Sequence, residues 1–437
     1  MNEYPNQLKN TLTSIIRQMS EKPGAFVKNP LTDFTRTRKL PFESVIQLLI
    51  SMGGNSIYKE LLESAGYDMN TATTSAFIQQ RDKILPDAFL FLLREFVGSF
   101  RNIKTFRGYR LLAYDGSDLP IPADRHDPDT YFQNHPGEKG YGLLHLNALY
   151  DLCNKIYIDA CTQAKRCEYE QRALTDMVDH SPICDKAILI ADRGLECYNV
   201  FAHIEKKGWH YLIRAKDLGS SGIASGLALP KDGEFDIPIR RLLTRRQTNE
   251  IKARPDIYKF MPKTQEFDFL VPRSHDCYTM CFRVVRLKIA ENSYEILITN
   301  LPQSEFSSAD LKELYRMRWG IETSFRALKY TIGLINFHAK KRERILQETF
   351  ARMILYNFAE MITSHVIISQ ASMEYTYQVN FTVAVHVCRQ FLRLSDHAPP
   401  LHVEALIRKN ILPIRPGRKG TRKIRHKSAV SFLYRVA

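Results

Sequence analysis

The sequence predicts a mixed α/β protein with helical regions at both ends. Apolar residues recur at helical spacing in 41–52 and again in 87–100. From about residue 106 short apolar runs typical of strands alternate with helical stretches, and helical patterns dominate again from about 308 to 370. A chain of 437 residues exceeds one usual domain, so we expect more than one folding unit around a sizeable core.

The central part of this pattern runs through three strands, a helix, a strand, a helix and a strand, which suits a mixed sheet. The strands are expected at 109–115, 141–151, 155–163, 186–192 and 209–216, and the helices at 169–180 and 196–207. A β-rich block interrupts the pattern, with strands expected at 234–241, 267–273 and 278–289, before a strand at 293–300 resumes it.

These changes of pattern divide the chain into five expected regions. They are a helical N-terminal domain at 1–105, the first part of the α/β domain at 106–216, a β-rich insertion at 217–290, the second part of the α/β domain at 291–370, and a helical C-terminal region with a basic tail at 371–437. No internal repeat of 20–50 residues is present.

The chain carries a strong excess of positive charge. Its 62 Lys and Arg residues against 47 Asp and Glu residues give a net charge of +15. Such a surface favours nucleic acid, because each neutralised phosphate releases counterions; a ribosome-associated or merely basic soluble protein is the alternative. Nine basic residues and no acidic one fall in 408–427, which predicts a basic arm on the DNA backbone unless this is only a solvated charge run.

A helix-turn-helix motif that reads DNA ends is expected between the two apolar helices of the N-terminal domain. Residues 56–63 and 71–84 would form its helices, and Gly66 would lie in the turn. The second helix begins with threonines able to cap it. We expect it to carry outward the side chains of Gln79, Gln80, Arg81 and Lys83. A plain helical bundle is the alternative.

The cysteines and the hydropathy exclude other classes of protein. None of the eight cysteines falls in a CxxC pair or in a Cys/His set with zinc spacing, so we expect them to be reduced. No stretch reaches about 18 uninterrupted apolar residues, and the first residues show no basic segment followed by an apolar one. We therefore expect a cytoplasmic protein, associated with the nucleoid when it binds DNA.

Two expected strands deliver an aspartate to the point where the strand stops. Asp115 precedes Gly116, and Asp192 lies two residues before Gly194. Carboxylates at the carboxyl ends of strands are well placed to bind a metal ion, although aspartate is also a common turn or cap residue there. Two acidic neighbours receive structural interpretations: Asp118 is expected in a turn, and Glu196 is expected to begin a helix.

A third group of polar residues lies on the segment 313–334, which has the composition of one long helix. At about 100° per residue, four side chains fall within an arc of roughly 60°. They are Tyr315, Arg318, Glu322 and Lys329. One face of the helix therefore carries a phenol, two cations and a carboxylate; a routine surface ion pair is the alternative.

The spacing of these four residues resembles the YREK signature of bacterial insertion-sequence transposases of the IS-four type. The chain is also similar to that family in Asp115 within DGS, in Asp192 within ADRG, and in the ITNLP run at 298–302. The resemblance covers roughly residues 30 to 370. Four residues at fixed spacings together with two correctly placed aspartates make a more specific signal than any single short motif.

The resemblance implies a ribonuclease H-like catalytic domain in which Asp115, Asp192 and Glu322 bind two Mg²⁺ ions, with Mn²⁺ able to substitute. Hard oxygen ligands suit Mg²⁺, and such an ion pair supports in-line displacement at phosphorus. The implied activity is cut-and-paste transposition. Its implied substrates are the terminal inverted repeats and the target DNA, both double-stranded, and its implied assembly is a homodimer in the synaptic complex.

The resemblance also implies that Tyr315, Arg318 and Lys329 hold the DNA near the cleaved end, where guanidinium and ammonium groups can bind phosphate. A hairpin at the transposon end is the implied intermediate. Tyr294 and Trp319 are candidates for stacking on an extruded base, with plain packing as the alternative.

Two other functions stay open at this point. A domesticated DNA-binding protein could keep the fold without the chemistry, although the intact acidic triad argues against it. A ribonuclease H-like nuclease could share every metal ligand, and only the joining of a 3′-hydroxyl to target DNA separates it from a transposase.

Overall fold

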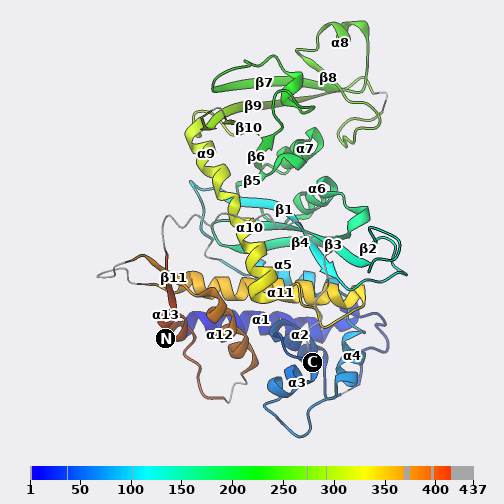
Figure 1. Ribbon diagram of the computed structural model, residues 1–437, viewed down its shortest axis with the longest axis vertical. Helices are drawn as coiled ribbons and strands as arrows, with labels where there is room; N and C mark the ends of the chain where they lie inside the picture. The colour runs from blue at the N-terminus through cyan, green and yellow to red at the C-terminus, as the bar shows by residue number, and fades with distance from the viewer. Residues whose placement is uncertain are drawn as a thin grey trace.

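The computed structural model describes residues 2–36, 38–101, 103–272, 274–291, 293–368, 375–394 and 398–414. The molecule is elongated, with a layer of helices at one end and a twisted sheet that extends away from it (Figure 1). Both ends of the chain contribute to the helical layer, whereas the middle of the chain forms the sheet. The prediction of a mixed α/β fold with helical regions is confirmed.

The helical layer combines segments that are far apart in the sequence. Its helices are α1 (Glu3–Glu21), α2 (Phe42–Ser51), α3 (Ile57–Ser64), α4 (Thr74–Arg81), α5 (Asp87–Gly98), α11 (Arg342–His365), α12 (Phe381–Arg393) and α13 (Val403–Lys409). Helix α11 is buried along most of its length because it packs against α2, α5, α12 and strand β4. Polar residues are buried on it as well, among them Glu348 and Arg352, which pair with each other.

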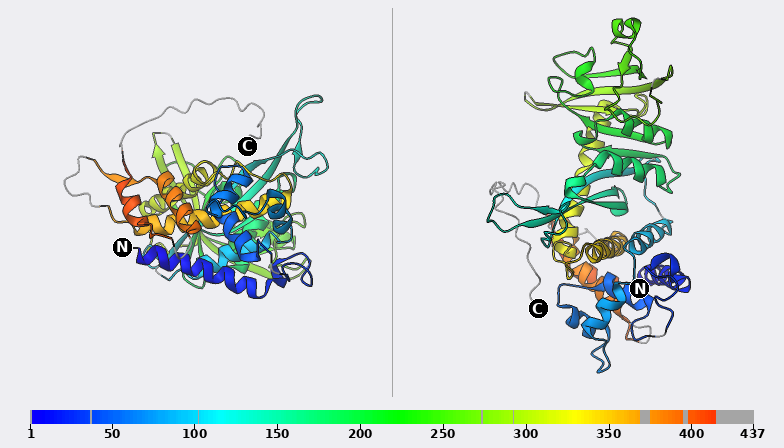
Figure 2. Two further views of the ribbon diagram at one scale, coloured as in Figure 1. Left: turned by 90° about the horizontal axis from the view of Figure 1, so that it is seen from below. Right: turned by 90° about the vertical axis from the view of Figure 1, so that its right-hand side faces the viewer.

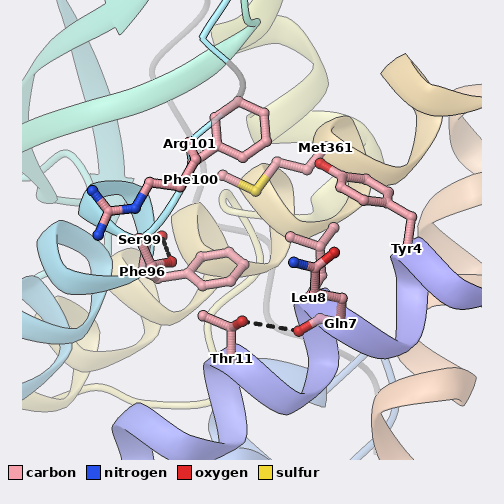
Figure 3. A pocket seen from close by; sticks show the side chains of 9 residues that line it. All are labelled: Tyr4, Gln7, Leu8, Thr11, Phe96, Ser99, Phe100, Arg101 and Met361. Atoms are coloured by element: carbon pink, nitrogen blue, oxygen red, sulfur yellow. Dashed lines mark hydrogen bonds between the residues drawn. The ribbon is translucent and has the colours of Figure 1, made fainter.

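A small cavity of about 100 Å³ lies where α1, α5 and α11 meet (Figure 3). The hydroxyls of Thr11 and Ser99 on its lining donate to backbone carbonyls of their own helices, those of Gln7 and Phe96. Both hydroxyls therefore already have hydrogen-bond acceptors within the helical layer.

The sheet is mixed. Its strands are β1 (Arg110–Ile121), β2 (Tyr131–Phe132), β3 (Tyr141–Asp151), β4 (Ile156–Ala164), β5 (Ala187–Ala191), β6 (His210–Ala215), β7 (Phe235–Thr244), β8 (Tyr258–Phe260), β9 (Cys277–Ala290) and β10 (Ser293–Thr299). The strand order is β2-β3-β1-β5-β6-β10-β9-β7-β8, and β4 pairs with β3. Strands β1, β5 and β6 run parallel, and β10 joins them antiparallel. The segment between β1 and β3 projects from the body of the molecule (Figure 2).

Along the chain, α6 (Glu170–His180) comes between β4 and β5, and α7 (Tyr198–Lys206) comes between β5 and β6, as expected. The β-rich block does not form a separate sheet, because β7 and β9 continue the same sheet through β10. A short helix α8 (Asn249–Ala253) leads to β8 at its edge.

The strand expected at 267–273 is wrong. Residues 267–272 form a loop, and Asp268 attaches this loop to α7: the backbone N–H of Asp268 donates to Asn199 Oδ1, and its carboxylate lies 3.0 Å from His203 Nε2. Phe267 and Leu270 are buried in this loop. The apolar spacing that suggested a strand therefore reflects packing of a loop.

The helix-turn-helix prediction needs a correction at Arg81. Helices α3 and α4 are present, and Thr73 caps α4 by accepting a hydrogen bond from the backbone N–H of Ala76. Gln79 is exposed, but Arg81 is only 1 % exposed and does not point outward. Its guanidinium binds Glu348 of α11, because a buried cation requires a paired anion.

The segment expected as one long helix consists of three consecutive pieces. They are α9 (Ser308–Met317), α10 (Trp319–Arg326) and a π-helical segment (Ala327–Ile332). Ser307 and Asp310 form a capping box at the start, and Gly333 ends the run with a φ of 92°. The π-helical segment means that Lys329 does not follow the regular helical angle assumed from the sequence.

Beyond α11 the described chain includes a small sheet of β11 (Tyr377–Val379) and β12 (Ile411–Pro413). Of the basic run at 408–427, residues 415–427 lie outside the described residues, as does the rest of the chain to 437. All eight cysteines are free. Among the described residues no helix combines the length and the apolar character that a membrane crossing demands.

Candidate active site

Two aspartates meet where β1 and β5 part. The last paired residues of these parallel strands are Ala113 and Ile190, and Asp115 and Asp192 each lie two residues further on. The parallel register thus brings both carboxylates to the same edge of the sheet. Asp192 follows the end of β5, and its Oδ1 accepts a hydrogen bond of 2.9 Å from the backbone N–H of Gly194.

The expected end of β1 at Asp115 is wrong, because β1 continues to Ile121. Antiparallel pairing with β3 carries the strand on: Asp115 lies opposite Ala148, and Asp118 lies opposite His145. Only the β5 side of β1 opens at Asp115, which gives that carboxylate its access. Asp118 is therefore a strand residue and not a turn residue.

The third carboxylate, that of Glu322, comes from α10. Arg318, at the joint between α9 and α10, donates to Glu322 Oε1 at 2.7 Å, and its other terminal nitrogen lies 3.6 Å from Asp115 Oδ2. On the opposite side of α10 the hydroxyls of Ser324 and Tyr157 of β4 are 2.8 Å apart. This contact holds α10 against the sheet with its carboxylate at the same edge as Asp115.

The electrostatics of this edge are dominated by negative charge. The pKa of Asp115 is raised to about 6, mainly by burial and in part by the charges of Asp192 and Glu322, although Arg318 and the backbone N–H of Gly116 oppose the rise. The three carboxylate ligand atoms do not all lie within 4.8 Å of one another. One guanidinium compensates only part of this charge, so the edge favours cations.

Two other residues of the YREK signature, Tyr315 and Lys329, lie near the same edge. Tyr315 is 8 % exposed, and the guanidinium of Arg318 lies 5.7 Å from the centre of its ring. Lys329 Nζ donates to Ser117 Oγ and to the backbone carbonyl of Asp118, both at 2.7 Å. The ring of Tyr315 thus packs against the guanidinium of Arg318, and Lys329 is hydrogen-bonded to β1.

The two aromatic candidates lie in different surroundings. Trp319 is 52 % exposed and lines a cavity of about 760 Å³ between α10, α11 and the small C-terminal sheet. Tyr294, on β10, is half-buried, and the guanidinium of Arg286 lies 4.2 Å from its ring centre. Only the Trp319 ring is largely open to a ligand.

The sequence reasoning missed two residues beside the aspartates, His145 and Glu170. His145 Nδ1 lies 2.7 Å from Asp118 Oδ1, and its Nε2 lies 2.9 Å from Glu170 Oε1. Neither residue belongs to a spacing motif; the acidic Asp118 so close to Asp115 was the available signal. Glu196 accepts the backbone N–H groups of Lys216 and Ile223, so it fixes a loop and does not begin α7.

Comparison with known proteins identifies the family. The chain is 34 % identical over 73 residues to the putative transposase InsL for insertion sequence element IS186A of Escherichia coli strain K12. It has the same identity over 73 residues to the transposase for insertion sequence element IS421 of Escherichia coli. The match spans 16 % of this chain and about a fifth (20 %) of each relative.

A piggyBac transposase in a synaptic complex with hairpin DNA is a solved structure with some similarity, at a TM-score of 0.43 and 12 % identity over 96 % of this chain and 88 % of that one. The family described as "Transposase DDE domain" matches residues 106–358, a range that includes Asp115, Asp192 and Glu322. Because this range is more than half of the 437 residues, the chain belongs to the family of transposases with a DDE domain.

Proposed function

We propose that this protein is the transposase of an insertion sequence and that Asp115, Asp192 and Glu322 are its catalytic carboxylates. The observation that carries the proposal is the convergence of these three side chains, from β1, β5 and α10, at one open edge of the sheet. All three lie within the range that the family matches. The proposed reaction is cleavage of the transposon ends followed by their joining to target DNA.

The residues present fit a site for divalent metal ions. The donor set consists of carboxylate oxygens, which Mg²⁺ and Mn²⁺ prefer. The raised pKa of Asp115, which burial causes and Asp192 and Glu322 reinforce, supports this assignment because a cation would relieve the charge that Arg318 leaves uncompensated. When bound, two such ions would stabilise the attacking and the leaving oxygen of an in-line displacement at phosphorus.

Three further residues would serve the binding of the DNA end, two by contact and Tyr315 by supporting one of them. Arg318 can bind a phosphate oxygen pair once cations take over its contacts with Asp115 and Glu322, because a guanidinium offers two parallel donors. Tyr315 would keep that guanidinium in place. Lys329, docked on β1, would supply a point charge beside the same phosphates.

We further propose a hairpin intermediate in which Trp319 stacks on an unpaired base. Forming a hairpin requires unstacking, which costs a few kcal/mol, and an exposed aromatic ring can offset part of that cost. The 52 % exposure of Trp319 and its position directly after Arg318 support this role. Tyr294 has less support, because Arg286 covers its ring.

The arrangement of the sheet supports a ribonuclease H-like catalytic domain. Strands β4, β3, β1, β5 and β6 follow one another in space, with β3 antiparallel to its neighbours and β5 and β6 parallel to β1. We propose that residues 106–216 and 291–370 form this domain, 217–290 its insertion, 1–105 the part that reads the DNA ends, and 371–437 the basic C-terminal region. A homodimer would pair two ends of double-stranded DNA.

The test is incubation of the purified protein with Mg²⁺ and a labelled duplex that carries an end of its own element. Products are resolved on a denaturing gel beside those of Asp192→Ala. We expect nicked, hairpin and joined products that vanish in the variant. Nicks without joining would instead identify a nuclease, and binding without cleavage would identify a DNA-binding protein that has lost the chemistry.

A further inference from the structure

Glu170, the first residue of α6, extends its carboxylate over the edge where β1 and β5 part. A Cβ atom built on Gly116 would lie 2.4 Å from Glu170 Oε1, and one built on Gly194 would lie 3.7 Å from Glu170 Oε2. Gly116 directly follows Asp115, and the N–H of Gly194 donates to Asp192. One carboxylate therefore borders the backbone beside both aspartates of the candidate site.

The position of Glu170 also explains why Gly116 has no side chain. The same Cβ atom on Gly116 would lie 2.2 Å from His145 Nε2, a separation that real Cβ atoms do not adopt. Any larger residue would displace His145 or Glu170. The glycine of the DGS motif thus leaves room for this histidine and carboxylate.

A histidine holds Glu170 in place. His145 is 4 % exposed. Its Nδ1 lies 2.7 Å from Asp118 Oδ1, and its Nε2 lies 2.9 Å from Glu170 Oε1. Lys165 Nζ lies 2.9 Å from Asp118 Oδ1 and fixes that carboxylate in turn. Because His145 occupies Oε1, the other oxygen of Glu170 stays available on the side of Gly194 and Asp192.

A metal ion bound within this neighbouring cluster is the competing interpretation. Asp118, His145 and Glu168 do offer ligand atoms within 4.8 Å of one another. The ammonium of Lys165, however, already contacts both Asp118 and Glu168. Both ring nitrogens of His145 also have carboxylate partners already, Asp118 and Glu170. The cluster therefore satisfies its own carboxylates through Lys165 and His145.

We propose that Glu170 is a fourth carboxylate of the metal-binding edge, acting with Asp192, and that His145 is the positioning residue that aims it. This inference rests on the proposed function, since it assumes that Asp115, Asp192 and Glu322 bind divalent cations. Its physical basis is that an additional hard oxygen at the edge strengthens cation binding. Residues that orient ligands of this kind typically contribute 10- to 100-fold in metal affinity.

The experiment measures Mn²⁺ binding to the full-length protein without DNA, from the loss of the electron paramagnetic resonance signal of free Mn²⁺. The variants are Asp192→Asn, Glu170→Gln and the control Asp176→Asn, which removes one exposed carboxylate from the same helix. We expect Mn²⁺ affinity to fall by about tenfold or more in Asp192→Asn and in Glu170→Gln, and to stay within about twofold in the control.

Wild-type Mn²⁺ affinity in Glu170→Gln, beside a weakened Asp192→Asn, would overturn the role of Glu170 and leave the proposed function intact. Wild-type affinity in Asp192→Asn would overturn the metal-binding edge itself. Thermal unfolding without Mn²⁺ checks that each variant is folded. Should Glu170→Gln unfold, Glu170→Asp decides the matter, because it keeps the charge but withdraws the oxygens; unchanged affinity there counts against the proposal.

Discussion

Two charged clusters of this protein differ in how well their charges are compensated. At the proposed catalytic edge the three carboxylates outnumber the cations beside them, Arg318 and Lys329, and the side chains of Asp115 and Glu322 are 23 % and 30 % exposed. In the helical layer a single carboxylate, that of Glu348, lies between the guanidinium groups of Arg81 and Arg352 and is 2 % exposed. One cluster has excess negative charge and access to solvent, and the other has neither.

The pKa shifts of the two clusters run in opposite directions. Burial raises the pKa of Asp115 to about 6, whereas the pKa of Glu348 is lowered although burial alone would raise it. Hydrogen bonds from His338 and the charges of Arg81 and Arg352 outweigh the loss of solvent around Glu348. A buried carboxylate with matched partners stabilises the fold, and an undercompensated group of carboxylates at an open edge suits a cation-dependent site.

The largest effect is expected from Glu322→Gln, which removes charge from the undercompensated cluster. Cleavage of the DNA end should fall by about a thousandfold or more, since metal-ion stabilisation of a transition state is worth several kcal/mol and about 1.4 kcal/mol corresponds to tenfold. Binding of the uncleaved end in Ca²⁺, followed by fluorescence anisotropy, should stay within about twofold. Lost end binding in a folded variant would make Glu322 a structural residue.

Glu348→Gln tests the compensated cluster and should cost stability. The variant leaves Arg81 and Arg352 buried without their anion, which typically destabilises a protein by about 3–5 kcal/mol. Urea denaturation measures the change. Glu343→Gln is the control, because Glu343 pairs with Lys28 at the surface and should contribute less than about 1 kcal/mol. Equal stability of the two variants would contradict the contrast between the clusters.

Local patterns explain what the sequence could predict about the site. Short apolar runs that end in aspartate located Asp115 and Asp192, and helical spacing placed Arg318 and Glu322 on one face. Both patterns depend only on neighbours in the chain. The structure brings these four residues to one edge of the sheet.

Long-range pairing explains what the sequence could not predict. Strand β1 runs on to Ile121 because β3, some thirty residues later, pairs with it. Arg81 is buried because α4 docks on a helix more than 260 residues away. His145 and Glu170 lie on different elements, and no fixed spacing links them to Asp115, so only the folded chain shows that they meet beside it.

Lys329→Met tests a cation of the proposed catalytic edge and should have an intermediate effect on DNA binding. Lys329 is held on β1 by Ser117 and by the carbonyl of Asp118, beside the proposed path of the cleaved end. Loss of one phosphate contact should weaken binding of a precleaved end in Ca²⁺ by about tenfold, in line with about 1.5 kcal/mol for a charged hydrogen bond.

The control for this measurement is Lys312→Met, which removes the same charge from α9, where Lys312 donates to the backbone carbonyl of Lys288 on β9. It should change end binding by less than about twofold. Equal weakening in both variants would show that Lys329 contributes only general positive charge to DNA binding.

The smallest effect concerns Glu205 of α7, a carboxylate that lacks compensation but lies apart from the site. Burial raises its pKa to about 7, the hydroxyl of Tyr211 donates to it at 3.3 Å, and no ion pair among the described residues includes it. A carboxyl group with a raised folded-state pKa contributes stability at low pH that is lost as the pH rises through about 7. Glu205→Gln should therefore gain stability relative to the wild type between pH 5 and pH 8.

We expect this relative gain to be on the order of 1 kcal/mol in urea denaturation, because solvent reaches the half-buried carboxyl group and screens part of the effect. Glu21→Gln, an exposed change at the end of α1, corrects for the general loss of one negative charge. If only Glu205→Gln gains stability, a buried carboxylate without a paired cation lowers the stability of the fold when it lies away from the site. A difference that does not vary with pH would mean that burial leaves the ionisation of such carboxyl groups unaffected, and the electrostatic argument at Asp115 would then lose its support.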